Sequence, residues 1–456
     1  MIQGKKARPA RRARTYGRRG IMEKRRIAAG FGVAAAMTLI AGVMFACAPQ
    51  GTTSVPAADT GSSAPEGLTV DEKDGIRHVV NNDIAAQYPE IWASIDHTEQ
   101  GRSHAYIEEY MSWENDGTGD HNVLCIACKS NLFNDAYDEL GDDLFKTDAE
   151  GNHPRMSDLS PELQEKAQDM WTCETCHEGG SDGPVSSQIV YFNELGADLK
   201  AKVSDNVAAC GQCHNVLAAI KDVEGLDIKN TNPYKYGITP DGFLQFTSEI
   251  GGTKLEDEAT GIVLYRANHP TVEMYSGSQH EAMGLDCSDC HMVSMTSEDG
   301  KPYTSHNASG VISENNLALE KCLDCHETQN GVKTPKDMLY FLRAKQTELA
   351  NKQGVVQTKL NNLYDQILSA VNSGSANKDV LDGAREAYSR ATTYIEWGAQ
   401  SFITTFANKN LTTNPLAGSD GQGRTAAHNF DGSMDYLARA EAMIDDALES
   451  LSAQQA

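Results

Sequence analysis

Five pairs of cysteines, each separated by two residues, constrain this 456-residue chain more than any other feature of its sequence. A histidine follows four of the pairs directly, whereas Lys129 follows the first pair. The pairs use ten of the eleven cysteines and leave only Cys47, near the N-terminus. The five segments are Cys125-Ile-Ala-Cys128-Lys129, Cys173-Glu-Thr-Cys176-His177, Cys210-Gly-Gln-Cys213-His214, Cys287-Ser-Asp-Cys290-His291 and Cys322-Leu-Asp-Cys325-His326.

The C-x-x-C-H pattern is the attachment motif of c-type haem, in which two thioethers hold the porphyrin and the adjacent imidazole reaches the iron. Zinc ribbons, disulfides and thioredoxin-like redox pairs also use paired cysteines. A zinc ribbon has no need of a histidine after every second cysteine, and five short disulfide loops are unusual in a loop-rich chain. The sequence therefore predicts five haem c groups, attached through these ten cysteines.

The ligands of the five irons are predicted to differ. The residues after the second cysteines, Lys129, His177, His214, His291 and His326, are the expected proximal ligands. An amine binds iron only after losing a proton, from a group whose ordinary pKa is about 10.4. A haem closed on both sides transfers electrons, and one with an open face can do chemistry. We therefore expect the Lys129 haem to be reactive and the others to relay electrons; the alternative is a surface Lys129 and a distant histidine ligand.

The order of the motifs resembles the ammonia-forming cytochrome c nitrite reductase family of pentahaem cytochromes c552. The likeness is a leading C-x-x-C-K and four C-x-x-C-H motifs, whose first cysteines are 48, 37, 77 and 35 residues apart. It implies four distal histidine ligands. They are His104 in Ser103-His104-Ala105-Tyr106 for the third haem, His306 in Tyr303-Thr304-Ser305-His306 for the second, His280 for the fifth and His428 for the fourth.

The resemblance also implies a substrate pocket around the segment Arg266-Ala267-Asn268-His269-Pro270. His269 takes the place of the family's catalytic histidine, which can donate a hydrogen bond to a nitrogen oxide and later a proton. Arg266 stands where the family has a calcium-ligating lysine, so that its charge can replace the calcium ion. Arg266 and Asn268 are therefore candidate pocket residues.

Two other parts of this pocket depart from the family. Val216 and Leu217 stand where the resemblance implies a calcium-binding glutamate and a catalytic tyrosine. Residues 103–128 contain no Arg or Lys, although the family has an arginine shortly before its first motif. An anion needs positive charge and proton donors aimed at its oxygens, and Tyr234 and Tyr236 are further candidate donors. Calcium binding is not expected.

Two functions remain open. The resemblance implies reduction of nitrite to ammonium by a homodimer that takes electrons from a membrane multihaem quinol dehydrogenase. The lost tyrosine, arginine and calcium site favour an alternative: an electron-transfer pentahaem cytochrome, or a reductase of another small oxidant such as hydroxylamine or sulfite.

Residues 1–47 read as an export signal. Residues 1–46 hold eleven of the 39 Lys and Arg and one of the 64 acidic residues, and residues 27–46 carry no charge. Met44-Phe45-Ala46-Cys47 resembles a lipoprotein cleavage box, which makes Cys47 a candidate lipidation site; an uncleaved anchor and ordinary cleavage are the alternatives. Each of these places the body in the periplasm or on the outer face of the cytoplasmic membrane. The rest of the chain has a net charge of −35, which excludes nucleic-acid binding.

The expected fold is mainly α. Residues 48–67 are small and Pro/Ser/Thr-rich and predict a flexible linker. Residues 68–330 are expected to form a loop-rich pentahaem core with short helices at the motifs. Residues 331–456 are expected to form a helical region with a dimer contact. Its apolar periodicity predicts a helix of roughly 35 residues after Pro335, a second from Lys378 to Asn408 and a third from Met434 to Leu451.

Overall fold

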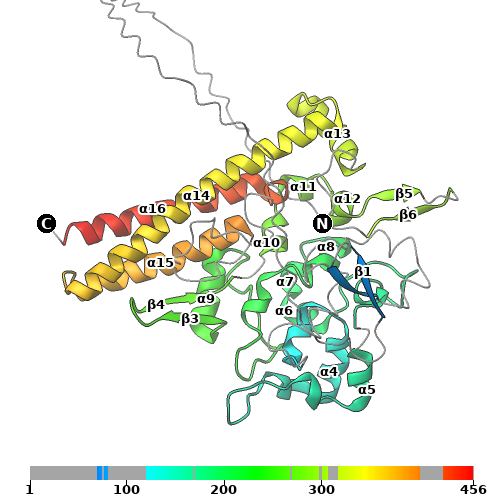
Figure 1. Cartoon of the computed structure of the whole chain (residues 1–456), viewed down its shortest axis with the longest axis horizontal. Coiled ribbons are helices and arrows are strands. Elements are labelled where there is room, and N and C mark those ends of the chain that lie inside the picture. Colours follow the sequence, from blue (N-terminus) through cyan, green and yellow to red (C-terminus); the bar gives the residue numbers. More distant parts are fainter. Residues whose placement is uncertain are drawn as a thin grey trace, which may run out of the picture. The chain divides into compact units, whose positions relative to one another are not determined.

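The computed structural model describes residues 120–167, 170–267, 270–296, 300–306, 317–400 and 425–454, with the backbone of 69–73 and 76–80. The predicted signal and linker lie outside these residues. The fold is mainly α, as predicted, with short helices up to residue 330 and three long helices after it (Figure 1).

Short helices alternate with loops through the first of these regions. Several begin with a side chain that accepts a hydrogen bond from the first turn, as Ser160, Ser204 and Thr239 do. The helices are η2 (Val123–Cys128), α4 (Leu132–Leu140), η3 (Gly141–Phe145), η4 (Met156–Asp158), α5 (Pro161–Lys166), η6 (Cys173–Thr175), α6 (Val190–Leu195), α7 (Ala197–Lys200), α8 (Asp205–Gly211), η7 (Val216–Ala219), α9 (Pro240–Ile250), α10 (Thr271–Tyr275), α11 (Gln279–Ala282), α12 (Cys287–His291) and α13 (Leu317–Asn330).

Each cysteine motif starts on or within one of these helical segments. The motif at Cys125 lies in η2, that at Cys173 begins η6, and that at Cys210 lies near the end of α8. The fourth and fifth motifs lie entirely within α12 and α13. Residues three apart share one face of a helix, so a helical C-x-x-C directs both sulfurs to the same side.

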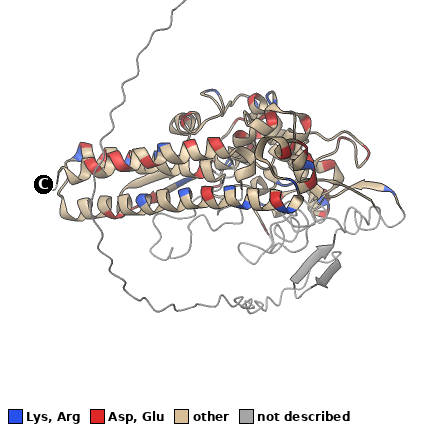
Figure 2. Ribbon diagram, turned by 90° about the horizontal axis from the view of Figure 1, so that it is seen from above, with Lys and Arg blue, Asp and Glu red and all other residues tan. Residues whose placement is uncertain are grey.

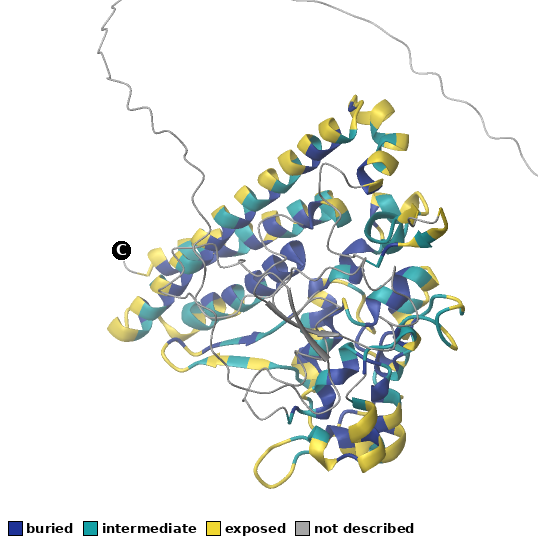
Figure 3. Ribbon diagram, turned by 45° about the vertical axis from the view of Figure 1, so that its right-hand side comes forward, coloured by how far each residue is buried: buried dark blue, intermediate teal, exposed yellow. Residues whose placement is uncertain are grey.

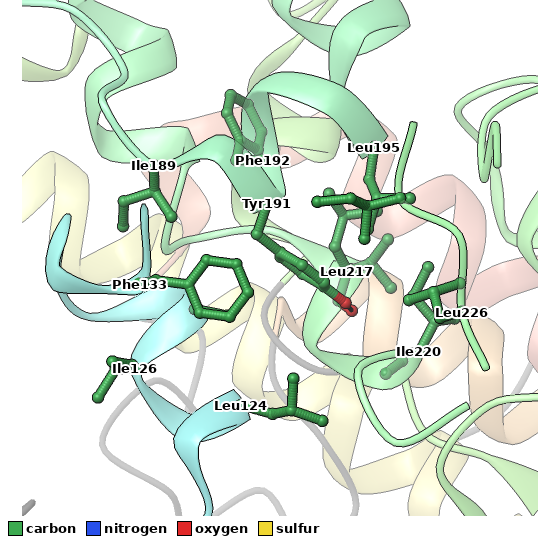
Figure 4. Packing of buried hydrophobic residues seen from close by; sticks show 14 of the residues in the cluster. Leu124, Ile126, Phe133, Ile189, Tyr191, Phe192, Leu195, Leu217, Ile220 and Leu226 are labelled. Atoms are coloured by element: carbon green, nitrogen blue, oxygen red, sulfur yellow. Dashed lines mark hydrogen bonds between the residues drawn. The ribbon is translucent and has the colours of Figure 1, made fainter. Parts of the chain in front are cut away.

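Buried apolar side chains from many short elements form one cluster around Tyr191 of α6 (Figure 4). Its ring meets Phe133 of α4 edge to face, with the centroids 5.8 Å apart. Leu124 from η2 and Leu217 from η7 belong to the same cluster. The cluster therefore joins the first motif to the segment that follows the third.

Three long helices contact one another: α14 (Pro335–Ser373), α15 (Lys378–Ala399) and α16 (Ala426–Ser452). Thr334 caps α14, Asn377 caps α15, and Gly374 ends α14 in the left-handed conformation that glycine adopts at low cost. Their apolar stripes face inward, and the outward faces are exposed (Figure 3).

Charged residues follow the outer sides of these helices (Figure 2). Lys359 of α14 makes an ion pair of 2.7 Å with Asp445 of α16, and Lys352 pairs with Glu441 beside it. Exposed pairs contribute about 0–1 kcal/mol each, so the buried stripe is the main source of stability between the two helices.

The described strands form three antiparallel hairpins. They pair β1 (Thr69–Lys73) with β2 (Ile76–Val80), β3 (Lys254–Asp257) with β4 (Ile262–Tyr265), and β5 (Ser294–Thr296) with β6 (Pro302–Thr304). The hairpin β3–β4 packs on α15, where Ile262 and Leu264 enter the core of the long helices.

The predicted bounds of two long helices are wrong. The second helix ends at Ala399 and not at Asn408, because Gln400 adopts a left-handed conformation with φ of 52°. The third begins at Ala426, eight residues before the predicted Met434. The extra N-terminal part holds few large apolar residues, and the helix is kinked at Asn429, whose backbone is not helical, so an apolar period does not extend through it.

Candidate functional site

The first three motifs lie close together. The ten motif cysteines form no disulfide in the described part of the chain. Burial raises the pKa of the Cys213 thiol well above its ordinary value, and the thiols of Cys128 and Cys176 raise it further. Such mutual effects require short distances, so the third motif lies beside both the first and the second.

The third, fourth and fifth motifs also lie near one another. The thiol of Cys210 is hydrogen-bonded to that of Cys287, and this contact, with burial, raises the pKa of Cys210 well above its ordinary value. Burial raises the pKa of Cys290 to about 11, and Cys322 of the next motif adds to the effect. The five motifs therefore form one connected group, with the third between the first two and the last two.

In two pairs of histidines, the imidazole rings lie at similar distances from each other and are tilted relative to each other. The ring centroids of His280 and His326 are 6.3 Å apart, and those of His291 and His428 are 6.0 Å apart. An iron held by two imidazoles at metal–nitrogen distances of about 2.0 Å separates the ring centroids by about 6 Å. These two pairs of residues therefore fit a haem iron between the rings.

A third pair lies close together as well. Burial lowers the pKa of His306, and the neighbouring His177 lowers it further. The resemblance assigns these two residues to the second haem. Four predicted site residues lie outside the described residues: Cys47, His104, Asn268 and His269. His104 is the partner expected for His214.

Hydrogen bonds fix the orientation of five of these rings. In each, Nδ1 lies within 3.0 Å of a carbonyl or amide oxygen, which holds the proton on Nδ1 and leaves Nε2 with its lone pair. Metal-ligating histidines are held in this way. The contacts are His177 to Gly183 O, His280 to Ala427 O, His306 to Thr304 O, His326 to Asn330 Oδ1 and His428 to Gln400 Oε1.

Lys129 follows η2 directly, and its ammonium donates to Cys125 O at 3.2 Å. Its charge acts on the sulfurs of Cys128 and Cys213. The side chain therefore lies near the sulfurs of the first and third motifs.

Arg266 is tied to the long helices. Its half-buried guanidinium has a pKa lowered by burial, an effect that the charge of Glu396 on α15 opposes. Glu396 is 1% exposed and accepts a hydrogen bond of 2.8 Å from Ala267 N. The segment that leads to His269 is thus anchored by a buried carboxylate, a residue that sequence reasoning missed.

Val216 and Leu217, which stand in the places of a glutamate and a tyrosine, are buried in the apolar cluster, and their backbone groups bond to polar side chains from elsewhere in the chain. Tyr191 donates to Leu217 O at 2.9 Å, and Val216 N donates to Glu273 Oε1 at 2.9 Å. Tyr234 also donates to Glu273 Oε1, at 2.6 Å. Sequence reasoning missed Glu273, although it is the single acid in the apolar run 272–275, four residues after His269.

The two tyrosines proposed as pocket donors differ in their exposure to solvent. Tyr234 is buried, whereas Tyr236 is 38% exposed and donates to Glu249. Of the two candidate donors, Tyr234 is therefore the buried one, and Tyr236 lies at the surface.

Lys221 brings positive charge to the first motif. It is paired with Asp222 at 2.7 Å, and its side chain is 24% exposed. Burial lowers its pKa, but Asp222 and the nearby sulfurs of Cys125 and Cys128 outweigh burial and raise it. A positive charge near the first motif thus comes from a segment almost a hundred residues later, where Asp222 pairs with it.

Within the described residues, no group of three or more His, Cys, Asp or Glu is arranged to hold a bare metal ion. No described helix has the length and apolar character needed to cross a membrane.

A family model described as cytochrome c552 matches residues 91–433. Cytochrome c-552 of Haemophilus influenzae is 22% identical over 188 residues, which are 41% of this chain and 33% of that protein. Cytochrome c-552 of Parabacteroides distasonis is 25% identical over 223 residues, which are 47% of this chain and 42% of that protein. The alignments thus span less than half the length of these curated relatives.

A solved structure, the cytochrome c nitrite reductase of Desulfovibrio desulfuricans, superposes with a TM-score of 0.56 at 16% identity. The match covers 81% of this chain and 85% of that one. The likeness establishes a shared fold.

Proposed function

Because this chain belongs to the cytochrome c552 family, we propose that it is an exported pentahaem reductase that converts nitrite to ammonium at the Lys129 haem. The family consists of c-type cytochromes, so haem c is the cofactor that membership implies. The observation that carries the proposal is the contrast between Lys129 and the four C-x-x-C-H motifs, three of whose histidines lie near a second histidine.

In this proposal four haems have two histidine ligands each. The pairs supported by proximity are His177 with His306, His291 with His428, and His326 with His280. His104 is assigned to the same iron as His214 by the resemblance alone. When bound, the closed haems relay electrons, and the Lys129 haem supplies electrons together with an open coordination position.

The residues of the chain supply the electrostatics and the protons. Reduction of nitrite to ammonium consumes six electrons and eight protons and releases two waters, so proton delivery matters as much as electron delivery. Lys221 draws the anion toward the first motif. Arg266, anchored near Glu396, and His269 and Asn268 are the proposed groups at the substrate.

The proposal also covers the electron donor, the oligomeric state and the export of the protein. A multihaem quinol dehydrogenase of the membrane is the proposed electron donor, and the long helices are the proposed homodimer contact. Residues 1–47 are the proposed export signal, with lipidation at Cys47.

The test uses the haem-loaded protein, reduced with a viologen dye and supplied with nitrite. We expect stoichiometric ammonium, and a rate at least about tenfold lower for Lys129→His, because replacing a metal ligand costs at least as much as replacing the group that supports it. Lys378→His is the control, since that side chain is 85% exposed on α15. Dye reoxidation no faster than the background would remove nitrite as substrate.

The alternative is an electron-transfer cytochrome or a reductase of hydroxylamine or sulfite. The apolar Val216 and Leu217 favour it, because they place no donor of their own beside the substrate. Supplying hydroxylamine and sulfite in the same assay separates these functions, and an absence of any high-spin ferric signal would favour electron transfer alone.

A further inference from the structure

Glu273 of α10 is a buried acid between two segments of the proposed pocket. Its side chain is 4% exposed. Oε1 accepts hydrogen bonds from the Tyr234 hydroxyl at 2.6 Å and from Val216 N at 2.9 Å. The adjacent Val272 N donates to His214 O at 3.1 Å. The start of α10 is therefore held against the chain that follows the third motif.

The two oxygens of this carboxyl differ. Oε1 has two donors, whereas Oε2 is buried and has no hydrogen-bond partner within the described residues. A buried polar atom without a partner calls for an explanation such as an internal water or a catalytic role. A neutral carboxyl fits the pattern better than a carboxylate, because it leaves no unpaired buried charge, and its Oε2 proton then calls for an acceptor such as an internal water. Burial raises the pKa of Glu273 to about 7, although the bonds from Tyr234 and Val216 lower it, which agrees with this reading.

Glu273 and Tyr234 lie near the segments that the proposal assigns to the reactive centre. Glu273 follows His269 by four residues, and its partner Val216 precedes Leu217, which stands where the resemblance implies a catalytic tyrosine. The phenol of Tyr234 lies close enough to Tyr191 and to the Cys128 sulfur of the first motif for both to affect its pKa. Val216, Leu217 and Tyr234 also line a small, mainly apolar cavity of about 10 Å³, which Glu273 itself does not line.

We propose that Glu273, held by Tyr234, is a proton donor that carries a proton on Oε2 near the first motif, in place of the absent tyrosine. The catalytic part of this inference rests on the proposed function. In each turnover Oε2 gives up one proton and regains one from solvent, so the carboxyl is unchanged. The titratable groups that face the pair are Tyr191 from α6 and, where no haem is attached, the Cys128 thiol from η2.

The test is infrared spectroscopy of the haem-loaded protein in the ferric state, with and without cyanide. We expect a carbonyl band of a protonated carboxyl at pH 6 that shifts when cyanide binds. The band should be absent from Glu273→Gln and shifted in Tyr234→Phe, which loses one donor. Glu249→Gln is the control, since that exposed acid bonds to Lys235 and Tyr236.

The rate assay then adds the catalytic readout. Glu273→Gln should lower kcat for ammonium formation about tenfold or more, change KM less than twofold and remove the alkaline limb of the pH profile. If Glu273→Gln lost bound haem, its lower rate would reflect a structural role. The infrared spectra of the wild type and Tyr234→Phe would then be compared instead. A wild-type protein without a carboxyl band, or with a band insensitive to cyanide, would overturn the inference. A wild-type protein that makes no ammonium but has the cyanide-sensitive band would refute the nitrite function alone.

Discussion

At the scale of single residues, hydrogen bonds orient the histidines that are the proposed iron ligands. His428 is an example, because burial lowers the pKa of this ring to about 3 and its Nδ1 lies 2.7 Å from Gln400 Oε1. The ring is therefore neutral at pH 7, with Nε2 available to a metal. Gln400 can accept this bond because the chain leaves α15 in a left-handed turn at that residue.

Replacing Gln400 should tune the iron next to His428. Gln400→Glu gives the ring a carboxylate partner, which makes the imidazole a stronger ligand and should lower the reduction potential of that haem. Gln400→Gly removes the acceptor while keeping a residue that tolerates φ of 52°, and should raise the potential. A redox titration followed by visible absorption measures both. Shifts of the same sign in the two variants would contradict a role through the hydrogen bond.

Glu273 should also make stability depend on pH. Its pKa is raised from 4.5 to about 7 in the folded state, so the folded protein holds a proton that the unfolded chain has already lost. Stability therefore falls as pH rises from about 4.5 to about 7, by at most about 3 kcal/mol. Thermal unfolding of the wild type and Glu273→Gln over this range measures the difference. Equal pH dependence in the two proteins would show that Glu273 is ionised in the fold.

At the scale of elements, the short helices present the haem-binding groups and the long helices provide a rigid support. C-x-x-C on a helix places both sulfurs on one face, and α12 adds a capping box between Asp286 and Asp289. The support depends on apolar packing, since its ion pairs are partly exposed. Glu396 and Gln400 at the end of α15 then reach Ala267 and His428, so the long helices also position residues of the proposed pocket and a proposed iron ligand.

Truncation of the stripe on α14 should therefore be costly. Leu360 is fully buried between the long helices, so Leu360→Ala should lower the free energy of unfolding by about 2–5 kcal/mol. Val355→Ala on the same helix is the control, because that side chain is 51% exposed and should change stability by less than about 0.5 kcal/mol. Denaturant unfolding compares the two, and similar losses would mean that the stripe does not form the core.

At the scale of the whole molecule, the net negative charge of the chain repels the proposed substrate, nitrite. The chain beyond residue 46 has a net charge of −35, and nitrite is an anion. A field of the same sign slows association, and salt screens it over a Debye length of about 8–10 Å. Local cations such as Lys221 offset this field only near the first motif.

We therefore expect kcat/KM for nitrite to rise with ionic strength, about twofold or more between low and physiological salt. Uncharged hydroxylamine is the matched substrate and should show little dependence. Initial rates at several salt concentrations measure both. A fall in kcat/KM for nitrite would mean that a basic entrance dominates over the acidic surface.

Much of the haem chemistry is local and could be predicted from the sequence. The spacing of Cys287, Cys290 and His291 sets their mutual geometry once the segment is helical. The positions of His280 and His428 beside His326 and His291 also agree with the resemblance. Periodicity predicted three long helices, but it did not locate the end of α15, which a single left-handed residue decides.

The sequence by itself determined the cofactor class, the odd first motif and the mainly helical fold, because each depends on residues a few positions apart. Only the tertiary structure decided what surrounds Val216 and Leu217. Glu273, Tyr234 and Lys221 converge on the first and third motifs from separate segments, and no local pattern encodes contacts of that kind. Folding also sets their charge states, because burial and partners determine whether a carboxyl keeps its proton or an ammonium its charge.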